Sequence, residues 1–234
     1  MRLFWFLTVI YCLESAFVIS MEGMYPYHDV MENTHPKKER TLVIIKPDGV
    51  QRSLIGEIVR RYERTGLKLV ATKMLIPTPE MATEHYMVGG EEWLEGVGKK
   101  SAESYARKGQ KSPFATYREN GLAIMKANAT YLSAGPVVAM VWEGNGAVGV
   151  VRKITGSTEP MTSDVGTIRG DFTIDSYQIS DVDSRSIRNL IHASGNAEEA
   201  EKEIPIWFKE NELLNYRHLN EAILYDVNLD GILE

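Results

Sequence analysis

The chain has 234 residues, enough for one large or two small domains with a substantial buried core. Its formal net charge of −6 argues against a protein that coats nucleic acid or lies on an anionic membrane, because both need a basic face. A nucleotide remains an acceptable ligand, since a local cluster of Lys and Arg suffices to bind it. The single cysteine, Cys12, excludes a disulfide framework and a thiolate metal site, which fits a reducing compartment.

The first 39 residues are expected to lie outside the folded core. Residues 3–13 form an apolar run behind Arg2, which resembles the hydrophobic part of a signal peptide but is too short for an ordinary membrane-spanning helix. No clean cleavage site of small residues follows it. We favour the interpretation that translation starts downstream, at one of the methionines between positions 21 and 31. Residues 21–39 show no periodicity and are interpreted as a linker.

Four buried segments in the rest of the chain are predicted to be β-strands. The first is the clearest, because it is apolar and rich in β-branched residues, and Pro47 and Gly49 follow it. The second ends before Pro77. The predicted strands are Thr41–Ile45, Leu67–Ile76, Val137–Trp142 and Asn189–His192.

Helices are predicted between and after these strands. The last has the sharpest start, since Asn196 is a typical N-cap and Glu199 occupies the capping-box position. Residues 155–165 are rich in Thr, Ser and Pro and read as a loop, residues 173–188 are polar and expected to form a surface loop, and residues 217–234 read as a solvated tail. The predicted helices are Leu54–Arg64, Pro79–Tyr86, Glu91–Arg107, Arg118–Leu132, Ala147–Ile154 and Ala197–Phe208. Helices that alternate with about four buried strands indicate an α+β domain.

One glycine motif points to a function that we reject. Gly144, Gly146 and Gly149 follow a strand and open a helix, and so match the GxGxxG fingerprint of dinucleotide-binding folds. Such a fold next requires a second apolar strand that ends in an acidic residue. Residues 157–164 are polar and interrupted by a proline instead.

His192 is the residue around which a reaction can be built. It ends a short apolar run, just before the predicted helix that starts after Asn196. A phosphate can bind at such a place, because backbone N–H groups and the helix dipole favour anions. Imidazole is largely unprotonated near neutral pH, so it can attack phosphorus and hold a phosphoryl group. Alone this signal is weak, because a histidine beside an apolar run is more often structural.

Four separate motifs strengthen it. They are Thr41–Val50, Ser133–Gly144, Gly166–Phe172 and Arg188–Gly195. Together, and in this order, they closely resemble the nucleoside diphosphate kinase family from about Arg40 to Tyr216. The resemblance implies a ferredoxin-like βαββαβ sandwich with an antiparallel sheet and an extra helical insertion. The domain is then residues 40–216, with stretches longer than the common form near 87–128 and 173–187, and residues 217–234 are a tail.

The resemblance also implies roles for individual residues. ATP phosphorylates His192, ADP leaves, and a second nucleoside diphosphate takes the phosphoryl group, so the kinetics are expected to be ping-pong. Ser194 and Glu203 match the pair that orients the histidine ring, and Tyr86 matches a tyrosine near it. The residues that match the phosphate ligands are Lys46, Arg152, Thr158 and Arg169, and Asn189 matches the residue that contacts the ribose.

Cofactor, assembly and location follow from the same resemblance. Magnesium is expected, held mainly by the substrate phosphates and water, because Gly195 stands where the family usually has an aspartate and leaves no protein ligand to name. A homo-oligomer, a hexamer or a tetramer, and a cytoplasmic location are expected. The alternative is a nucleotide-binding scaffold that no longer turns over, but its sequence mark, loss of the histidine or of a phosphate-binding cation, is absent.

The residue that stacks on the nucleobase is open between two candidates. The family places an aromatic residue soon after the tyrosine matched by Tyr86, and stacking accepts every base because every base offers a π face. Trp93 lies at about the right distance along the chain, whereas Phe114 follows a proline as the family's aromatic residue does, but only after an inserted segment. We favour Trp93, because spacing fixes geometry more directly than a dipeptide match, and we expect loose recognition of the base.

Overall fold

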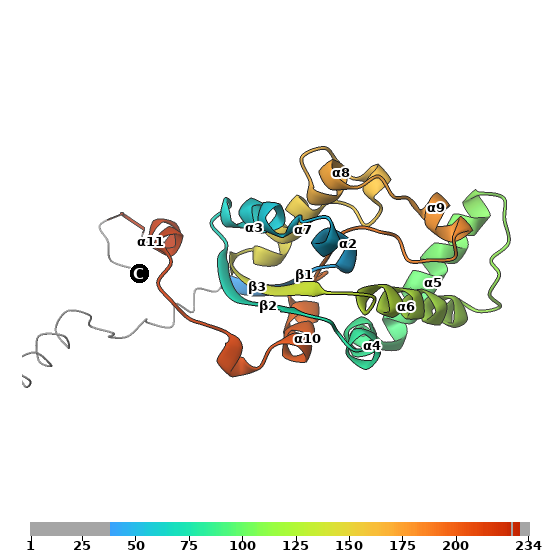
Figure 1. Ribbon diagram of the computed structural model, residues 1–234, viewed down its shortest axis with the longest axis horizontal. Coiled ribbons are helices and arrows are strands. Elements are labelled where there is room, and N and C mark those ends of the chain that lie inside the picture. The colour runs from blue at the N-terminus through green and yellow to red at the C-terminus, as the bar shows by residue number, and fades with distance from the viewer. Residues whose placement is uncertain (1–37, 226, 230–234) are drawn as a thin grey trace, which may run out of the picture. The chain divides into compact units, whose positions relative to one another are not determined.

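The computed structural model describes residues 38–225 and 227–229, so the apolar run and most of the predicted linker lie outside the described residues. A four-stranded sheet forms the centre, in the order β2-β3-β1-β4, and each neighbouring pair is antiparallel (Figure 1). The strands are β1 (Lys38–Ile45), β2 (Lys68–Leu75), β3 (Val137–Asn145) and β4 (Ile191–Ala193).

The sheet is buried on both faces, which explains why its strands are almost continuously apolar. Successive side chains of a strand point to opposite faces, and β1 divides accordingly: Leu42 and Ile44 belong to one hydrophobic core, and Val43 and Ile45 to the other. The single tryptophan of β3, Trp142, is fully buried in the second core.

Helices cover both faces of the sheet. In Figure 1, α10 and α4 lie on one side of the strands and α3, α7 and α8 lie on the other. The helices of the first side, with α6, contribute to the core that contains Leu42, and the others to the core that contains Val43. This is the expected ferredoxin-like α+β sandwich. The helices are α3 (Ile55–Glu63), α4 (Pro79–Met87), α6 (Tyr117–Leu132), α7 (Ala147–Thr155), α8 (Ile168–Phe172) and α10 (Ala197–Trp207).

The helices α6 and α5 (Gly90–Arg107) form a tightly packed pair. Their backbones approach so closely that only glycine fits at the contact. A Cβ on Gly98 would lie 1.8 Å from a backbone oxygen of α6, and a Cβ on Gly121 would lie 2.1 Å from one of α5. Asn120 is buried and donates from Nδ2 to the carbonyl of Gly98 at 3.0 Å. These contacts fix α5 on α6.

Several expected boundaries are wrong. β1 begins inside the predicted linker, because residues 38–40 pair with β3. A short helix, α2 (Pro47–Gln51), follows it directly, since proline suits the first turn of a helix. The segment 173–188 is not simply a loop: Ser176 caps a further helix, α9 (Tyr177–Val182). The predicted loop 155–165 contains one turn of 3-10 helix, Pro160–Thr162.

The C-terminal segment also contains secondary structure that its polar composition did not predict. A 3-10 turn, Glu210–Glu212, precedes the helix α11 (Leu219–Tyr225). Glu221 of α11 forms an ion pair with Lys38 at 3.1 Å and lies 3.7 Å from the buried Lys68. The part of the tail that the structure describes is therefore attached to the sheet by charge pairs. None of the helices within the described residues is long and apolar enough to cross a membrane.

Candidate active site

A cavity of about 610 Å³ lies where β1 ends and β4 begins, and the helices α5 and α9 form part of its wall. It brings together most of the residues singled out in the sequence. Those that line it are Lys46, Tyr86, Trp93, Arg152, Thr158, Arg169, Asn189 and His192. The two remaining candidates, Ser194 and Glu203, are buried and connect to His192 from behind.

His192 is held by a short chain of contacts that starts in the sheet. It lies on β4 with 17% of its side chain exposed, and its Nε2 is 3.0 Å from Oε1 of Glu203, a close pair although not a well-aligned hydrogen bond. Ser194 donates to Oε2 of Glu203 at 2.6 Å and accepts the backbone N–H of Leu42 at 3.1 Å. No hydrogen bond from the described residues occupies Nδ1, which leaves this nitrogen for chemistry.

Glu203 is an anion at neutral pH although only 6% of its side chain is exposed. Burial alone would raise the pKa of the carboxyl. The charge and contact of His192, together with His85 and the hydroxyl of Ser194, outweigh burial and lower the pKa to about 2. A fixed negative charge therefore stands beside Nε2 of His192.

His85 is a member of the site that the sequence analysis did not single out. It is buried, its ring is 4.4 Å from that of His192 at an interplanar angle of 85°, and its Nδ1 accepts the indole N–H of Trp207 at 3.3 Å. Burial, and then the charge of His192, lower its pKa to about 3, so the ring is neutral. The signal was present in the sequence, because His85 directly precedes Tyr86.

Tyr86 supports this cluster from the cavity side. Its ring packs against His85 at 5.0 Å, and its hydroxyl is buried without a hydrogen-bond partner among the described residues. Burial raises the pKa of the phenol, so it stays protonated. A hydroxyl with an unused donor on a cavity wall is available to a ligand.

Lys46 directly follows β1 and is buried, and its ammonium group donates to Oδ1 of Asn189 at 2.8 Å. Burial, followed by the charge of Arg169, lowers its pKa to about 7. An anion that enters the cavity would stabilise the charged form of Lys46. Asn189 is fixed as well, because its Nδ2 donates to the backbone oxygen of Thr158 at 2.9 Å.

Arg169 differs from the other cations because the fold already uses most of its donors. It lies on α8, is 8% exposed, and donates to four backbone carbonyls between 2.7 and 3.1 Å, those of Gly156, Ser157, Asn189 and Ile191. Burial lowers its pKa to about 10, so it keeps its charge. Arg169 therefore ties two loops to the strand of His192 and contributes positive potential to the cavity.

Arg152 and Thr158 are the free ligands of the group. Both are exposed, both line the cavity, and neither side chain has a hydrogen bond or ion pair within the described residues. Arg152 lies on α7. Its guanidinium can bind phosphate oxygens in a forked geometry without breaking any existing contact.

The backbone before His192 is not the regular strand that was expected. Leu190 is fully buried and has a left-handed φ of +68°, which is unfavourable for a residue with a side chain. Its N–H donates to Oδ2 of Asp48 at 3.2 Å, and its carbonyl accepts the N–H of Lys46 at 2.8 Å. Tyr131 donates to the other oxygen of Asp48 at 2.5 Å. These bonds hold a kink that separates Asn189 from β4.

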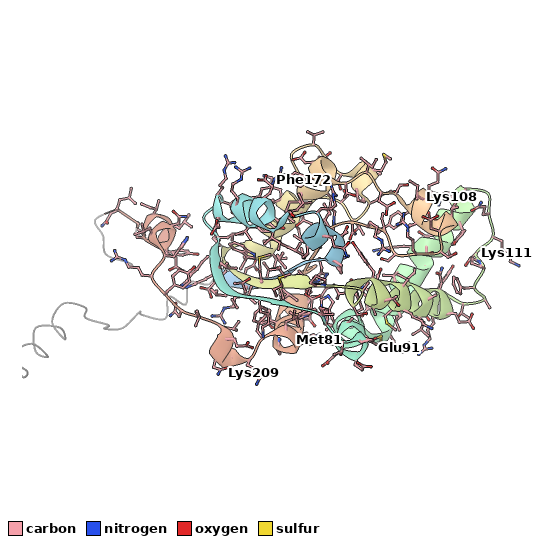
Figure 2. The ribbon with its side chains drawn as sticks, in the orientation of Figure 1. Met81, Glu91, Lys108, Lys111, Phe172 and Lys209 are labelled. Atoms are coloured by element: carbon pink, nitrogen blue, oxygen red, sulfur yellow. The ribbon has the colours of Figure 1, made fainter. Side chains whose placement is uncertain are left out.

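The outer part of the cavity lies between α5 and α9. Trp93 lines it and is 6.4 Å from Tyr86, ring centre to ring centre, whereas Phe114 is not among the lining residues. Sequence reasoning did not find the polar pair Ser186 and Asn128, which also line the wall and are joined by a 2.6 Å hydrogen bond. At the end of α5, Lys108, which is labelled in Figure 2, donates to Asp181 of α9 at 2.8 Å and connects the two helices.

A nucleophilic ring nitrogen beside a cluster of cations fits a phosphotransferase that acts on a nucleotide. Comparison with known proteins agrees. Residues 39–93 and 107–213 match the family described as nucleoside diphosphate kinase. A nucleoside diphosphate kinase of Pyrobaculum aerophilum is 43% identical over 184 residues, which cover 75% of this chain and 98% of that protein. One from Borreliella burgdorferi is 41% identical over 187 residues, which cover 80% and 97%. The chain belongs to the nucleoside diphosphate kinase family.

Solved structures agree with this assignment. The crystal structure of an NDP kinase from Pyrobaculum aerophilum has a TM-score of 0.73 and 41% identity, covering 76% of this chain and all of that one. A transition-state mimic of the enzyme from Borrelia burgdorferi, with bound vanadate and ADP, has a TM-score of 0.64 and 39% identity, covering 80% and 97%. Residues 94–106, most of α5, fall outside the match to the family pattern.

Proposed function

We propose that the protein is a nucleoside diphosphate kinase in which Nδ1 of His192 carries the phosphoryl group. One observation supports Nδ1, and not Nε2, as the nitrogen that is phosphorylated: Glu203 lies 3.0 Å from Nε2. A carboxylate there keeps the ring proton on Nε2, so the lone pair is on Nδ1. The site thus holds the ring in an orientation that leaves a lone pair on Nδ1, which is what attack on phosphorus requires.

The reaction has two halves at one site. In the first, Nδ1 of His192 attacks the γ-phosphorus, the N–P bond forms, the bond to the bridging oxygen breaks, and the nucleoside diphosphate leaves with that oxygen. The ring gains positive charge as the bond forms, and the anionic Glu203 stabilises it. In the second half, a terminal oxygen of another nucleoside diphosphate attacks the phosphorus and Nδ1 leaves, which restores the neutral ring.

The cationic side chains bind the phosphates, whose negative charge shifts during the transfer. Arg152 and Lys46 contact the phosphates, Arg169 adds positive potential from behind, and the hydroxyl of Thr158 donates a further hydrogen bond. Asn189 binds the ribose. The support for these roles is that all five residues line the cavity that contains His192.

Magnesium would enter with the substrate. Within the described residues, the acidic side chains that line the cavity, Glu103 and Asp181, belong to α5 and α9, and the carboxylate beside His192 is already engaged. We therefore infer that Mg²⁺ would be held mainly by the nucleotide phosphates and water. The ion would neutralise phosphate charge, and no residue of this chain is assigned as its ligand.

The assembly and the location are further predictions. The resemblance implies a hexamer or a tetramer and a cytoplasmic protein. Sedimentation at several concentrations tests the first, and a monomer at all of them would contradict it. Microscopy of the full-length protein tests the second, and it also tests the signal-like residues 1–20.

Labelling of His192 is the decisive experiment for the function. After incubation with ATP and Mg²⁺, the protein should carry a phosphate that is acid-labile and base-stable, because a phosphoramidate hydrolyses once its nitrogen is protonated. The His192→Ala variant should bind nucleotide without exchange between ATP and a pyrimidine diphosphate. A phosphate on serine, or an active His192→Ala variant, would overturn the proposal. Nucleotide binding without exchange by the unmodified protein would favour the scaffold alternative.

A further inference from the structure

Behind the phosphoryl-accepting nitrogen, three side chains form a cluster with the composition of a metal site. They are His85, His192 and Glu203, and one ligand atom from each lies within 4.8 Å of the others. Nε2 of His192 is 3.0 Å, and Nδ1 of His85 is 4.0 Å, from the same carboxylate oxygen of Glu203. Among the residues that the structure describes, this is the one such group of three.

We propose that this cluster binds a zinc ion, and that the ion switches the enzyme off. Two imidazoles and one carboxylate form a donor set typical of Zn²⁺. Mg²⁺, the cofactor of the reaction, prefers oxygen ligands in an octahedral arrangement. The cluster therefore distinguishes an inhibitory ion from the ion that arrives with the nucleotide. Binding of zinc does not depend on the proposed function, whereas inhibition does.

The spacing of the donors fits the ion. A point equidistant from three atoms so arranged lies roughly 2–3 Å from each, and Zn²⁺ binds nitrogen and carboxylate oxygen at about 2.0–2.2 Å, so a small contraction suffices. Of the three ligands, His192 lines the cavity, whereas His85 and Glu203 are buried. The bond that must give way is a long one, the 3.3 Å hydrogen bond from Trp207 to Nδ1 of His85.

His85 and Glu203 can ligate as they stand, and only His192 has to move a proton, from Nε2 to Nδ1. While Trp207 donates to Nδ1, the proton of His85 lies on Nε2, so Nδ1 can bind the metal without any transfer of protons. Glu203 is already ionised and already oriented by Ser194.

Inhibition follows from the position of one proton. When Nε2 of His192 ligates zinc, the proton of the neutral ring has to be on Nδ1. The lone pair that attacks phosphorus is then gone, and Glu203 no longer stabilises positive charge on the ring. Nucleotide can still bind, because Lys46 and Arg152 are not zinc ligands.

Calorimetry with Zn²⁺ and nucleotide-free protein tests binding directly. The full chain should bind one ion per subunit tightly, and His85→Gln should weaken binding at least about tenfold, the lower bound for disturbing even a group that only supports a ligand. Glutamine keeps an acceptor for Trp207, which favours folding. The control is a quadruple variant that removes the other common zinc ligands outside the cluster, Cys12→Ser, His28→Gln, His35→Gln and His218→Gln. It should bind like the unchanged chain.

Two further measurements keep the proposal open to refutation. With Mg²⁺-ATP in excess, Zn²⁺ should inhibit exchange by the unchanged chain, and should inhibit the residual activity of His85→Gln at least about tenfold less effectively. Diethyl pyrocarbonate should modify His192 of the unchanged chain more slowly in the presence of Zn²⁺, a test that needs no variant. Equal zinc binding by His85→Gln, loss of it in the quadruple variant, or unprotected His192 would overturn the proposal. Zinc binding at the cluster in a protein without exchange activity would refute the function and leave the site.

Discussion

The charge on Glu203 makes the stability of this protein depend on pH in a way that one substitution can isolate. The pKa of its carboxyl is 4.5 in an exposed setting and about 2 in the fold. At 1.36 kcal/mol for each pH unit, this difference stabilises the folded state by ~3 kcal/mol at neutral pH. The side chain is only 6% exposed, so solvent screening reduces this value little.

The sign follows from proton binding. Between pH 2 and 4.5 the unfolded chain holds the proton on Glu203 and the folded chain does not, so stability falls as the pH falls. The contribution is complete above about pH 5, and ~2 kcal/mol of it is lost by pH 3. Glu203→Gln keeps an acceptor for Ser194 but cannot titrate. The variant should therefore lose ~2 kcal/mol less than the unchanged chain between pH 5.5 and pH 3.

Urea unfolding at pH 5.5, 4 and 3, followed by tryptophan fluorescence, measures the difference. Glu201→Gln is the matched control, because it makes the same change on the exposed side of the same helix, α10. It should follow the unchanged chain at every pH. If Glu203→Gln and the unchanged chain lost the same free energy over this interval, the carboxylate would not be the stabilised anion described here.

Three other predictions concern the cavity. Because the pKa of Lys46 is about 7, kcat/KM should fall as the pH rises above 7, and Lys46→Arg should remove this fall in a pH-rate profile even if its activity is lower. Arg152→Ala should lose ~2 kcal/mol of transition-state stabilisation with an unchanged Tm. Arg169→Ala should lower both kcat/KM and Tm, because four carbonyls lose their donor. Equal Tm values for the two variants would contradict this. Trp93→Ala should weaken binding of all nucleoside diphosphates by a similar ~1–3 kcal/mol in calorimetric titrations, and a stronger effect from Phe114→Ala would reverse the assignment.

Local patterns were sufficient for most of the fold. The strand Thr41–Ile45 could be predicted because its apolar β-branched run is followed by proline and glycine. The start of α10 could be predicted because Asn196 is a strong N-cap. The helix α9 was missed, since its segment is polar and its cap, Ser176, is a residue equally common in turns. The helix α11 was missed because its attachment depends on Lys38 and Lys68, far away in the chain.

The sequence motifs predicted which residues belong to the site, but they did not predict its geometry. Eight of the residues that line the cavity were named from the sequence. The left-handed backbone at Leu190 could not be predicted from its residue type. That kink is imposed by Asp48 and Lys46, more than 140 positions away. His85 escaped notice for a related reason: its importance depends on a contact with His192 that only the folded chain creates.

The four carbonyls bound by Arg169 have a consequence for how such a protein could lose its activity. A descendant that abandoned catalysis would be free to change Arg152 or His192, since neither is needed to hold the backbone together. It would not be free to change Arg169, because the loops at Gly156 and Asn189 would lose the side chain that joins them to the strand. An arginine at this position thus reports that the two loops are joined to the strand, and it does not by itself report activity.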